Sequence, residues 1–232
     1  MPRGKPRFAT QVVRDSLLAV LLAWYAPLRA QVADGRRSYP SIPRPLPEVE
    51  EIALAMSAAP PEVSAAADIY VLRAEGPVKV RTGTNGCSCM VARDLHEGSL
   101  YPICFDREAT RTVLHRELME LTLRARGMSE EEVQRSVVAA VERGELEAPR
   151  TPALSYMMSS KQVLFASAYA DGRRVGAWSP HVMIYLPNAS PEQFGLSTPS
   201  KVTELFVAAP GSRGAHLVIK VPRWADSVTV PR

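Results

Sequence analysis

The stretch Val78-Lys79-Val80-Arg81-Thr82-Gly83-Thr84-Asn85-Gly86-Cys87-Ser88-Cys89-Met90-Val91 carries the clearest structural pattern in the chain. Its first four residues alternate apolar and charged side chains, which is typical of a strand with one buried face. Asn85-Gly86 is a favoured two-residue hairpin turn. With that turn, Val80 faces Val91 and Thr82 faces Cys89, so the turn and the apolar pattern indicate the same register. We therefore expect an antiparallel hairpin with Cys87 and Cys89 on its inner face.

The chain has three cysteines, Cys87, Cys89 and Cys104. Cys87 and Cys89 would share one face of a strand, where neighbours two apart point side by side and rarely bridge. We expect Cys104 to form a disulfide with Cys89 or Cys87, which would stabilise the fold by about 3 kcal/mol in the loop-entropy model. The alternative is three buried free thiols. No histidine lies at zinc-finger spacing from these cysteines, so we expect no metal site, and no sequence motif indicates a cofactor.

The first thirty residues have the pattern of a secretory signal. The chain opens with three basic residues, Arg3, Lys5 and Arg7. The apolar run from Leu17 to Ala26 is too short for a membrane-spanning helix, which needs about 20 apolar residues. Pro27 ends this run, and Ala30 offers the small residue that signal peptidases prefer. We predict a signal peptide over residues 1–30 with cleavage after Ala30; the alternative is an ordinary amphipathic helix.

Removal of this segment changes the charge of the protein. The whole chain has 28 basic and 24 acidic residues, and residues 31–232 hold 23 of each. A nucleic-acid-binding domain normally has a basic surface, so we expect no nucleic-acid partner. No second long apolar run follows, so we expect no membrane span in the mature chain. Export to the periplasm, the cell envelope or the medium would place the cysteines in an oxidising compartment.

For the mature chain, the sequence predicts an extended proline-rich arm over residues 31–47 and a single α+β domain over residues 48–232. A short helix should follow Pro47, with Val49, Ile52, Ala53 and Met56 on its inner face. A longer helix should begin after Asp106 and run to Arg126. The capping box that starts at Ser129 predicts a second helix, so that the two form a hairpin.

Strand patterns flank this helical pair on both sides. They predict a largely antiparallel sheet of about six strands. Besides the hairpin above, the candidate strands are Asp68–Ala74, Ala153–Met158, Val163–Tyr169, His181–Leu186, Thr203–Ala209 and Ala215–Val221. The segment His181–Leu186 is the most apolar of these and should be central.

The sequence contains no Gly-x-Ser-x-Gly elbow and no His-Glu-x-x-His motif. His181 begins the most apolar strand, and a histidine there is usually structural. A catalytic role would make it a base, with Ser159 or Tyr156 as the nearby polar group. His216 alternates with Lys220 on a strand, so we expect it to face water.

Four short stretches resemble a family of uncharacterised exported bacterial proteins. They are Gly83-Thr84-Asn85-Gly86-Cys87, Pro102-Ile103-Cys104-Phe105, Tyr156-Met157-Met158-Ser159 and Ser179-Pro180-His181. The resemblance covers roughly residues 48–190. It implies bacterial origin and export, and it carries no activity and no catalytic residue.

Two hypotheses of function follow. The first is a non-enzymatic exported domain that binds a small molecule or an envelope protein through the loop from Pro187 to Ser200, since binding residues concentrate on loops held by a rigid scaffold. The second is an exported hydrolase-like enzyme centred on His181. A structure discriminates between them by showing whether His181 lies in a pocket with Ser159 or Tyr156.

Overall fold

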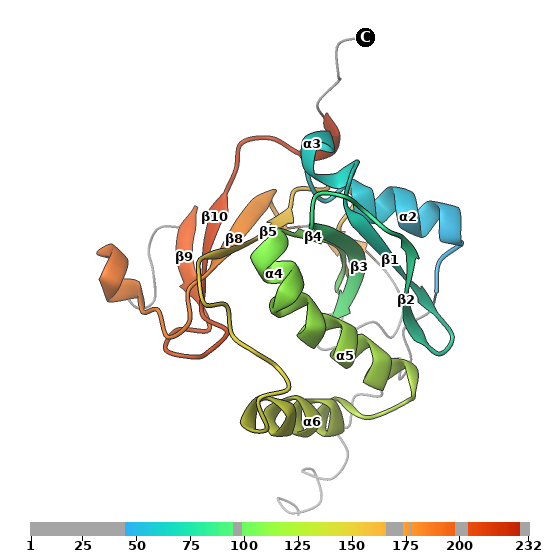
Figure 1. Ribbon diagram of the computed structural model, residues 1–232. Helices are drawn as coiled ribbons and strands as arrows, with labels where there is room; N and C mark the ends of the chain where they lie inside the picture. The colour runs from blue at the N-terminus through green and yellow to red at the C-terminus, as the bar shows by residue number, and fades with distance from the viewer. Residues whose placement is uncertain (1–44, 95–98, 166–173, 177, 198–203, 228–232) are drawn as a thin grey trace, which may run out of the picture. The chain divides into compact units, whose positions relative to one another are not determined.

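The computed structural model describes residues 45–94, 99–165, 174–176, 178–197 and 204–227, and all of them belong to one compact unit (Figure 1). The expected signal segment with its cleavage after Ala30 lies outside these residues, as does the arm up to residue 44. The described part combines helices with one sheet, which confirms the α+β class. None of its helices has the length and apolar character needed to cross a membrane.

The sheet is larger than expected and it is mixed. Eight strands of the described residues follow one another in the order β2-β1-β3-β4-β5-β8-β10-β9, and β6 and β7 extend it beside β4. The prediction of about six strands was therefore too small, and β1 pairs with β3 in parallel. The strands are β1 Asp68–Arg73, β2 Gly76–Arg81, β3 Ser88–Asp94, β4 Ser99–Phe105, β5 Ala153–Met157, β6 Val163–Phe165, β7 Arg174–Gly176, β8 His181–Tyr185, β9 Leu205–Ala208 and β10 His216–Lys220.

The predicted hairpin between β2 and β3 is wrong, because β1 lies between these two strands. The connecting segment crosses the start of β1: the Thr84 amide donates to the Ala66 carbonyl at 2.7 Å, and the Gly83 amide donates to the Asp68 carboxylate at 2.6 Å. Gly86 does adopt the positive φ that the turn pattern predicts, at 77°. Asn85 does not share this positive φ, so the two-residue hairpin turn does not form, and only the glycine conformation was predicted correctly.

The register of β3 and β4 selects one cysteine pair. Cys89 lies directly opposite Cys104, with Cα atoms 4.0 Å apart and the two sulfurs at disulfide distance. Cys87 would be a diagonal neighbour of Cys104, and diagonal Cα atoms of such strands lie about 7–8 Å apart, too far for a bridge. Cys87 is half-buried and its thiol is free, and burial raises its pKa.

Pro102 stands inside β4 although a proline cannot donate a backbone hydrogen bond. On the side away from β3, β4 pairs with β6 at Ser99 and Leu100 and with β5 at Cys104 and Phe105. Pro102 falls between these two pairings, where the strand has no ladder bond to lose. This explains how a proline is tolerated in the middle of the sheet.

The helices of the described residues are α2 Glu48–Met56, α3 Pro61–Ser64, α4 Arg107–Arg111, α5 Val113–Ala125 and α6 Glu130–Glu142, with short 3-10 turns η2 Pro191–Phe194 and η3 Ala225–Ser227. Helices α2, α4 and α6 begin where the sequence predicts, whereas α3, which begins at Pro61, was not expected. Asp106 caps α4 by accepting from the Ala109 amide at 2.7 Å, and Ser129 with Glu132 forms the capping box of α6. The single helix expected after Asp106 is broken at Thr112, whose hydroxyl donates to the Glu108 carbonyl at 2.7 Å.

The inner face of α2 differs from the expected one. Val49 is 81% exposed, whereas Glu51 is 1% exposed. The Glu51 carboxylate accepts from the Leu72 amide of β1 at 2.9 Å and from the Arg93 guanidinium of β3 at 3.0 Å. It lies where the parallel pairing of β1 and β3 has already stopped at Ile69, so it satisfies a strand amide that the sheet leaves unpaired.

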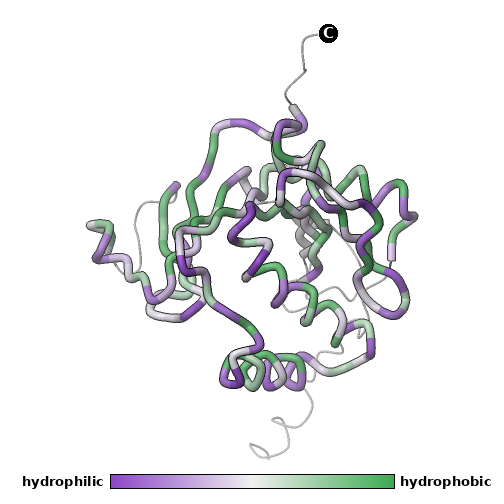
Figure 2. Tube along the Cα trace, in the orientation of Figure 1, coloured by the Kyte–Doolittle hydropathy of each residue, from purple (hydrophilic) through white to green (hydrophobic). Residues whose placement is uncertain are grey.

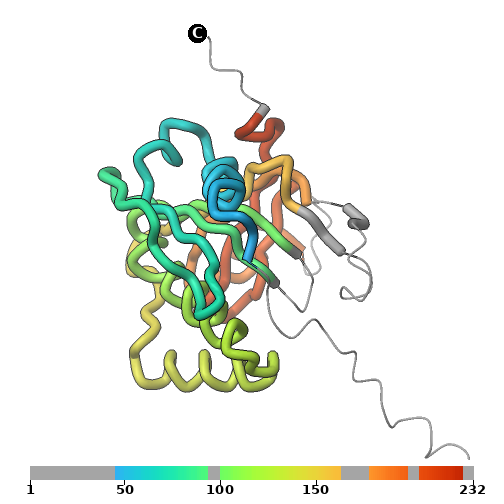
Figure 3. The backbone as a smooth tube through the Cα atoms, turned by 90° about the vertical axis from the view of Figure 1, so that its right-hand side faces the viewer, coloured from blue at the N-terminus to red at the C-terminus, as the bar shows by residue number. Residues whose placement is uncertain are grey.

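Helices α2 and α5 cover opposite faces of the sheet. Leu54 and Ala55 of α2 pack against Cys89 and Cys104, while Leu114 and Leu121 of α5 belong to the cluster on the other face. Figure 3 shows α2, in dark blue, lying over the strands β1 and β3. In Figure 2 hydrophobic and hydrophilic residues alternate turn by turn along α6, as expected for a helix that buries one face against α5.

Candidate functional site

His181 lies at the start of β8 and is buried. Its Nδ1 atom is 2.7 Å from the Ser179 carbonyl, and its ring meets that of Trp178 edge-on with centroids 6.4 Å apart. Burial lowers its pKa, and the contact with the Ser179 carbonyl offsets part of that effect. His181 is therefore a neutral side chain near neutral pH, held by a backbone carbonyl and an aromatic ring.

The structure does not bring His181 together with the other two predicted site residues. His181 pairs with Met157, and Tyr156 pairs with Val182, so Tyr156 and His181 point to opposite faces of the sheet. Tyr156 packs beside the cysteine cluster under α2. Ser159 is fully buried, with its hydroxyl 2.6 Å from that of Ser57 and 3.1 Å from the Lys161 amide, which donates to it.

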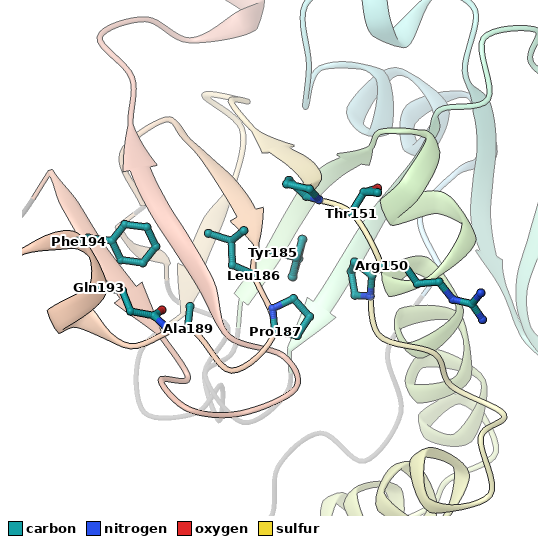
Figure 4. A pocket seen from close by; sticks show the side chains of 10 residues that line it. Arg150, Thr151, Tyr185, Leu186, Pro187, Ala189, Gln193 and Phe194 are labelled. Atoms are coloured by element: carbon teal, nitrogen blue, oxygen red, sulfur yellow. The ribbon is translucent and has the colours of Figure 1, made fainter.

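A cleft of about 420 Å³ opens at the other end of β8. Figure 4 shows Phe194 and Gln193 on one side of it, Arg150 and Thr151 on the other, and Tyr185, Leu186 and Pro187 between them. Most of its wall is apolar, as is usual for ligand pockets of this size. We call it the Tyr185 cleft; it is lined by Pro149, Arg150, Thr151, Pro152, Tyr185, Leu186, Pro187, Ala189, Gln193 and Phe194.

Each wall of the Tyr185 cleft is fixed by hydrogen bonds outside it. On one side the Arg150 amide donates to the Glu108 carboxylate at 2.8 Å, which ties the segment 149–152 to α4. The Arg150 guanidinium is 3.2 Å from Glu147 and points away from Phe194 (Figure 4). On the other side, the Ser190 amide donates to the Gln193 side chain at 3.0 Å and thereby starts η2. The cleft is thus preformed in the protein without a ligand.

Phe194 is the most exposed large apolar side chain of the cleft, at 37%. An exposed ring on a fixed turn is an anchor that a ligand can cover. The loop from Pro187 to Ser200, which the sequence indicates as a binding surface, contributes Pro187, Ala189, Gln193 and Phe194 to this wall. The segment 149–152 was not predicted, because only the fold brings it beside β8.

Tyr185 forms the inner wall and leads to a second group of polar residues. Its hydroxyl accepts from Ser155 at 3.4 Å, and its ring centroid lies 5.2 Å from that of His216 on β10. Burial raises the pKa of the Tyr185 phenol, so it is neutral. The expectation that His216 faces water was wrong: it is half-buried, because Tyr185 lies opposite it and covers its ring.

The wall of the Tyr185 cleft is mostly apolar and carries few polar side chains. Within the described residues, no three His, Cys, Asp or Glu side chains come together in a way that could hold a metal ion. The polar side chains on the cleft wall are those of Thr151, of Gln193, which is engaged in a cap, of Arg150, which is directed outward, and of Tyr185, whose hydroxyl accepts from Ser155. This wall can therefore make mainly apolar contacts with a ligand, together with a few polar ones.

Comparisons with protein-family models, curated proteins and solved structures found no significant match to the chain.

Proposed function

We propose that this protein is an exported, non-enzymatic domain that binds a small, largely apolar ligand in the Tyr185 cleft. The observation that carries the proposal is the cleft itself: a preformed apolar hollow of about 420 Å³ with Phe194 exposed on its wall. Its volume falls within the roughly 300–1,000 Å³ that ligand sites occupy. An aromatic or alicyclic group fits the flat surfaces that Phe194, Tyr185 and the prolines present.

Export is supported by the sequence of residues 1–30 and by the pair Cys89 and Cys104. A disulfide persists in oxidising compartments and is rare in the cytosol. Mass spectrometry of the unreduced protein recovered from the envelope of a bacterial host tests this point. We expect a chain that begins at Gln31 and a peptide linking Cys89 to Cys104. An intact Met1 together with three free thiols would contradict export.

Binding is tested with 4-phenylbutanamide, a soluble probe with one aromatic ring and a short chain, by titration calorimetry or NMR. Phe194→Ser should weaken its affinity about tenfold, since the ring supplies much of the apolar contact. Thr151→Trp should also weaken binding, because the larger side chain fills the space between the walls.

The matched control is Val138→Ser, which removes an exposed apolar side chain from α6, outside the cleft. It should leave the affinity unchanged. Equal affinities for the parent protein, Phe194→Ser and Thr151→Trp would show that the probe binds elsewhere.

A further inference from the structure

His216 presents a hydrogen-bond acceptor beside the Tyr185 cleft. Its Nδ1 atom is 2.9 Å from the Gly214 carbonyl, which can only accept, so Nδ1 carries the proton. Burial lowers the pKa of His216, the Gly214 contact opposes this, and the charge of Arg116 lowers it further. The neutral ring then has a lone pair on Nε2, and none of the described residues donates to that atom.

Arg116 of α5 supplies hydrogen-bond donors next to the same backbone. Its Nε donates to the Glu120 carboxylate at 2.7 Å, and its side chain is 46% exposed. A Cβ placed on Gly214 would lie 3.6 Å from Nη1 of Arg116, so the guanidinium lies alongside the residue whose carbonyl holds His216. In the part of the chain that the structure describes, its two Nη groups have no partner.

This pair adjoins the Tyr185 cleft through two strand contacts. His216 lies opposite Tyr185 in the ladder of β8 and β10, and the Leu186 amide donates to the Ala215 carbonyl at 2.9 Å. Tyr185 and Leu186 both line the cleft. His216 and Arg116 are not part of the cleft wall, so a ligand contacts them when it extends from the cleft past the ring of Tyr185, which lies against that of His216.

We propose that Arg116 and His216 recognise an uncharged amide group on the ligand that the Tyr185 cleft holds. The amide carbonyl accepts from an Nη group of Arg116, and the amide N–H donates to Nε2 of His216. This inference rests on the proposed function, because it assigns the polar end of the same ligand. An amide is the simplest group that offers one acceptor and one donor side by side.

A carboxylate fits this pair less well than an amide does. It offers acceptors alone, and Nε2 of a neutral histidine also only accepts. Glu120 pairs with both Arg116 and Arg124, and Arg124 also pairs with Glu130. Two carboxylates thus match two guanidinium groups, and the site has little excess positive charge with which to attract an anion. A neutral ligand leaves these ion pairs intact.

The test compares three probes of one shape on the whole protein near pH 7.5: 4-phenylbutanamide, methyl 4-phenylbutanoate and 4-phenylbutanoate. The ester keeps the carbonyl and lacks the N–H. The ratio of amide to ester affinity therefore measures the contribution of the hydrogen bond from the amide N–H to His216. We expect the amide to bind roughly fivefold more tightly than the ester. In His216→Leu the two affinities should become equal. In Arg116→Met both should fall while their ratio persists.

The outcomes separate this inference from the proposed function. If the amide and the ester bind with equal affinity in the cleft, or if 4-phenylbutanoate binds best, the amide assignment is overturned and the cleft remains a ligand site. If none of the three probes binds, the proposed function fails and the assignment falls with it. The comparison of probes on the parent protein does not depend on the folding of any variant.

Discussion

Glu51 shows how a helix can be predicted correctly while its buried face is predicted wrongly. Apolar spacing after Pro47 indicates a helix with Val49 inside, and the helix forms with Val49 outside. The spacing of apolar residues does not reveal that the carboxylate of Glu51 is needed at the point where β1 and β3 part. That requirement comes from the unpaired amide of Leu72 and from Arg93, which lie 21 and 42 residues away in the chain.

Replacing Glu51 should therefore destabilise the protein strongly. Glu51→Ala leaves the Arg93 charge and the Leu72 amide buried without this partner, so the free energy of unfolding should fall by about 3–5 kcal/mol. Urea unfolding followed by circular dichroism measures this loss. Glu48→Ala is the matched control on the same helix, since Glu48 forms a half-exposed ion pair with Arg73. It should cost less than about 1 kcal/mol, and similar losses in the two variants would contradict the role of Glu51.

At the level of helices and strands, the sequence predicts the helix caps correctly, but it does not predict which strands pair. The caps at Asp106 and Ser129 depend on neighbours within one turn, so the sequence reveals them. The hairpin through Asn85 and Gly86 looked equally local, and it is absent because the connection crosses β1. Which strands pair depends on burial across the whole sheet, and a tight turn alone does not decide it.

The crossing of β1 depends on Gly83. A Cβ at this position would overlap with the carbonyl of Ala66 and the backbone of Ala67. Gly83→Ala should lower the free energy of unfolding by about 1–3 kcal/mol, as expected for overpacking against rigid backbone. Gly214→Ala is the control, because a Cβ there meets only ordinary contacts; it should change stability by less than about 0.5 kcal/mol. Thermal denaturation compares the two, and an unaffected Gly83→Ala would show that the crossing is looser than described.

At the scale of the whole molecule, the Tyr185 cleft is assembled from segments that the sequence separates. The loop after Pro187 could be named in advance, because proline and polar residues mark a binding loop on a sheet. The opposite wall at 149–152 could not, because it depends on the Glu108 carboxylate holding that segment in place. The sequence suggested one site formed by His181, Ser159 and Tyr156. In the structure His181 and Tyr156 point to different faces of the sheet, because side chains alternate along a strand.

A chemical-shift map shows whether a ligand binds in the proposed Tyr185 cleft. The ¹⁵N-labelled protein is titrated with 4-phenylbutanamide and followed by heteronuclear NMR. We expect saturable shifts that cluster at the amides of Thr151, Leu186, Phe194 and His216. Saturable shifts that centre instead on His181 and Tyr156, or no shifts at millimolar probe, would rule out binding in the Tyr185 cleft.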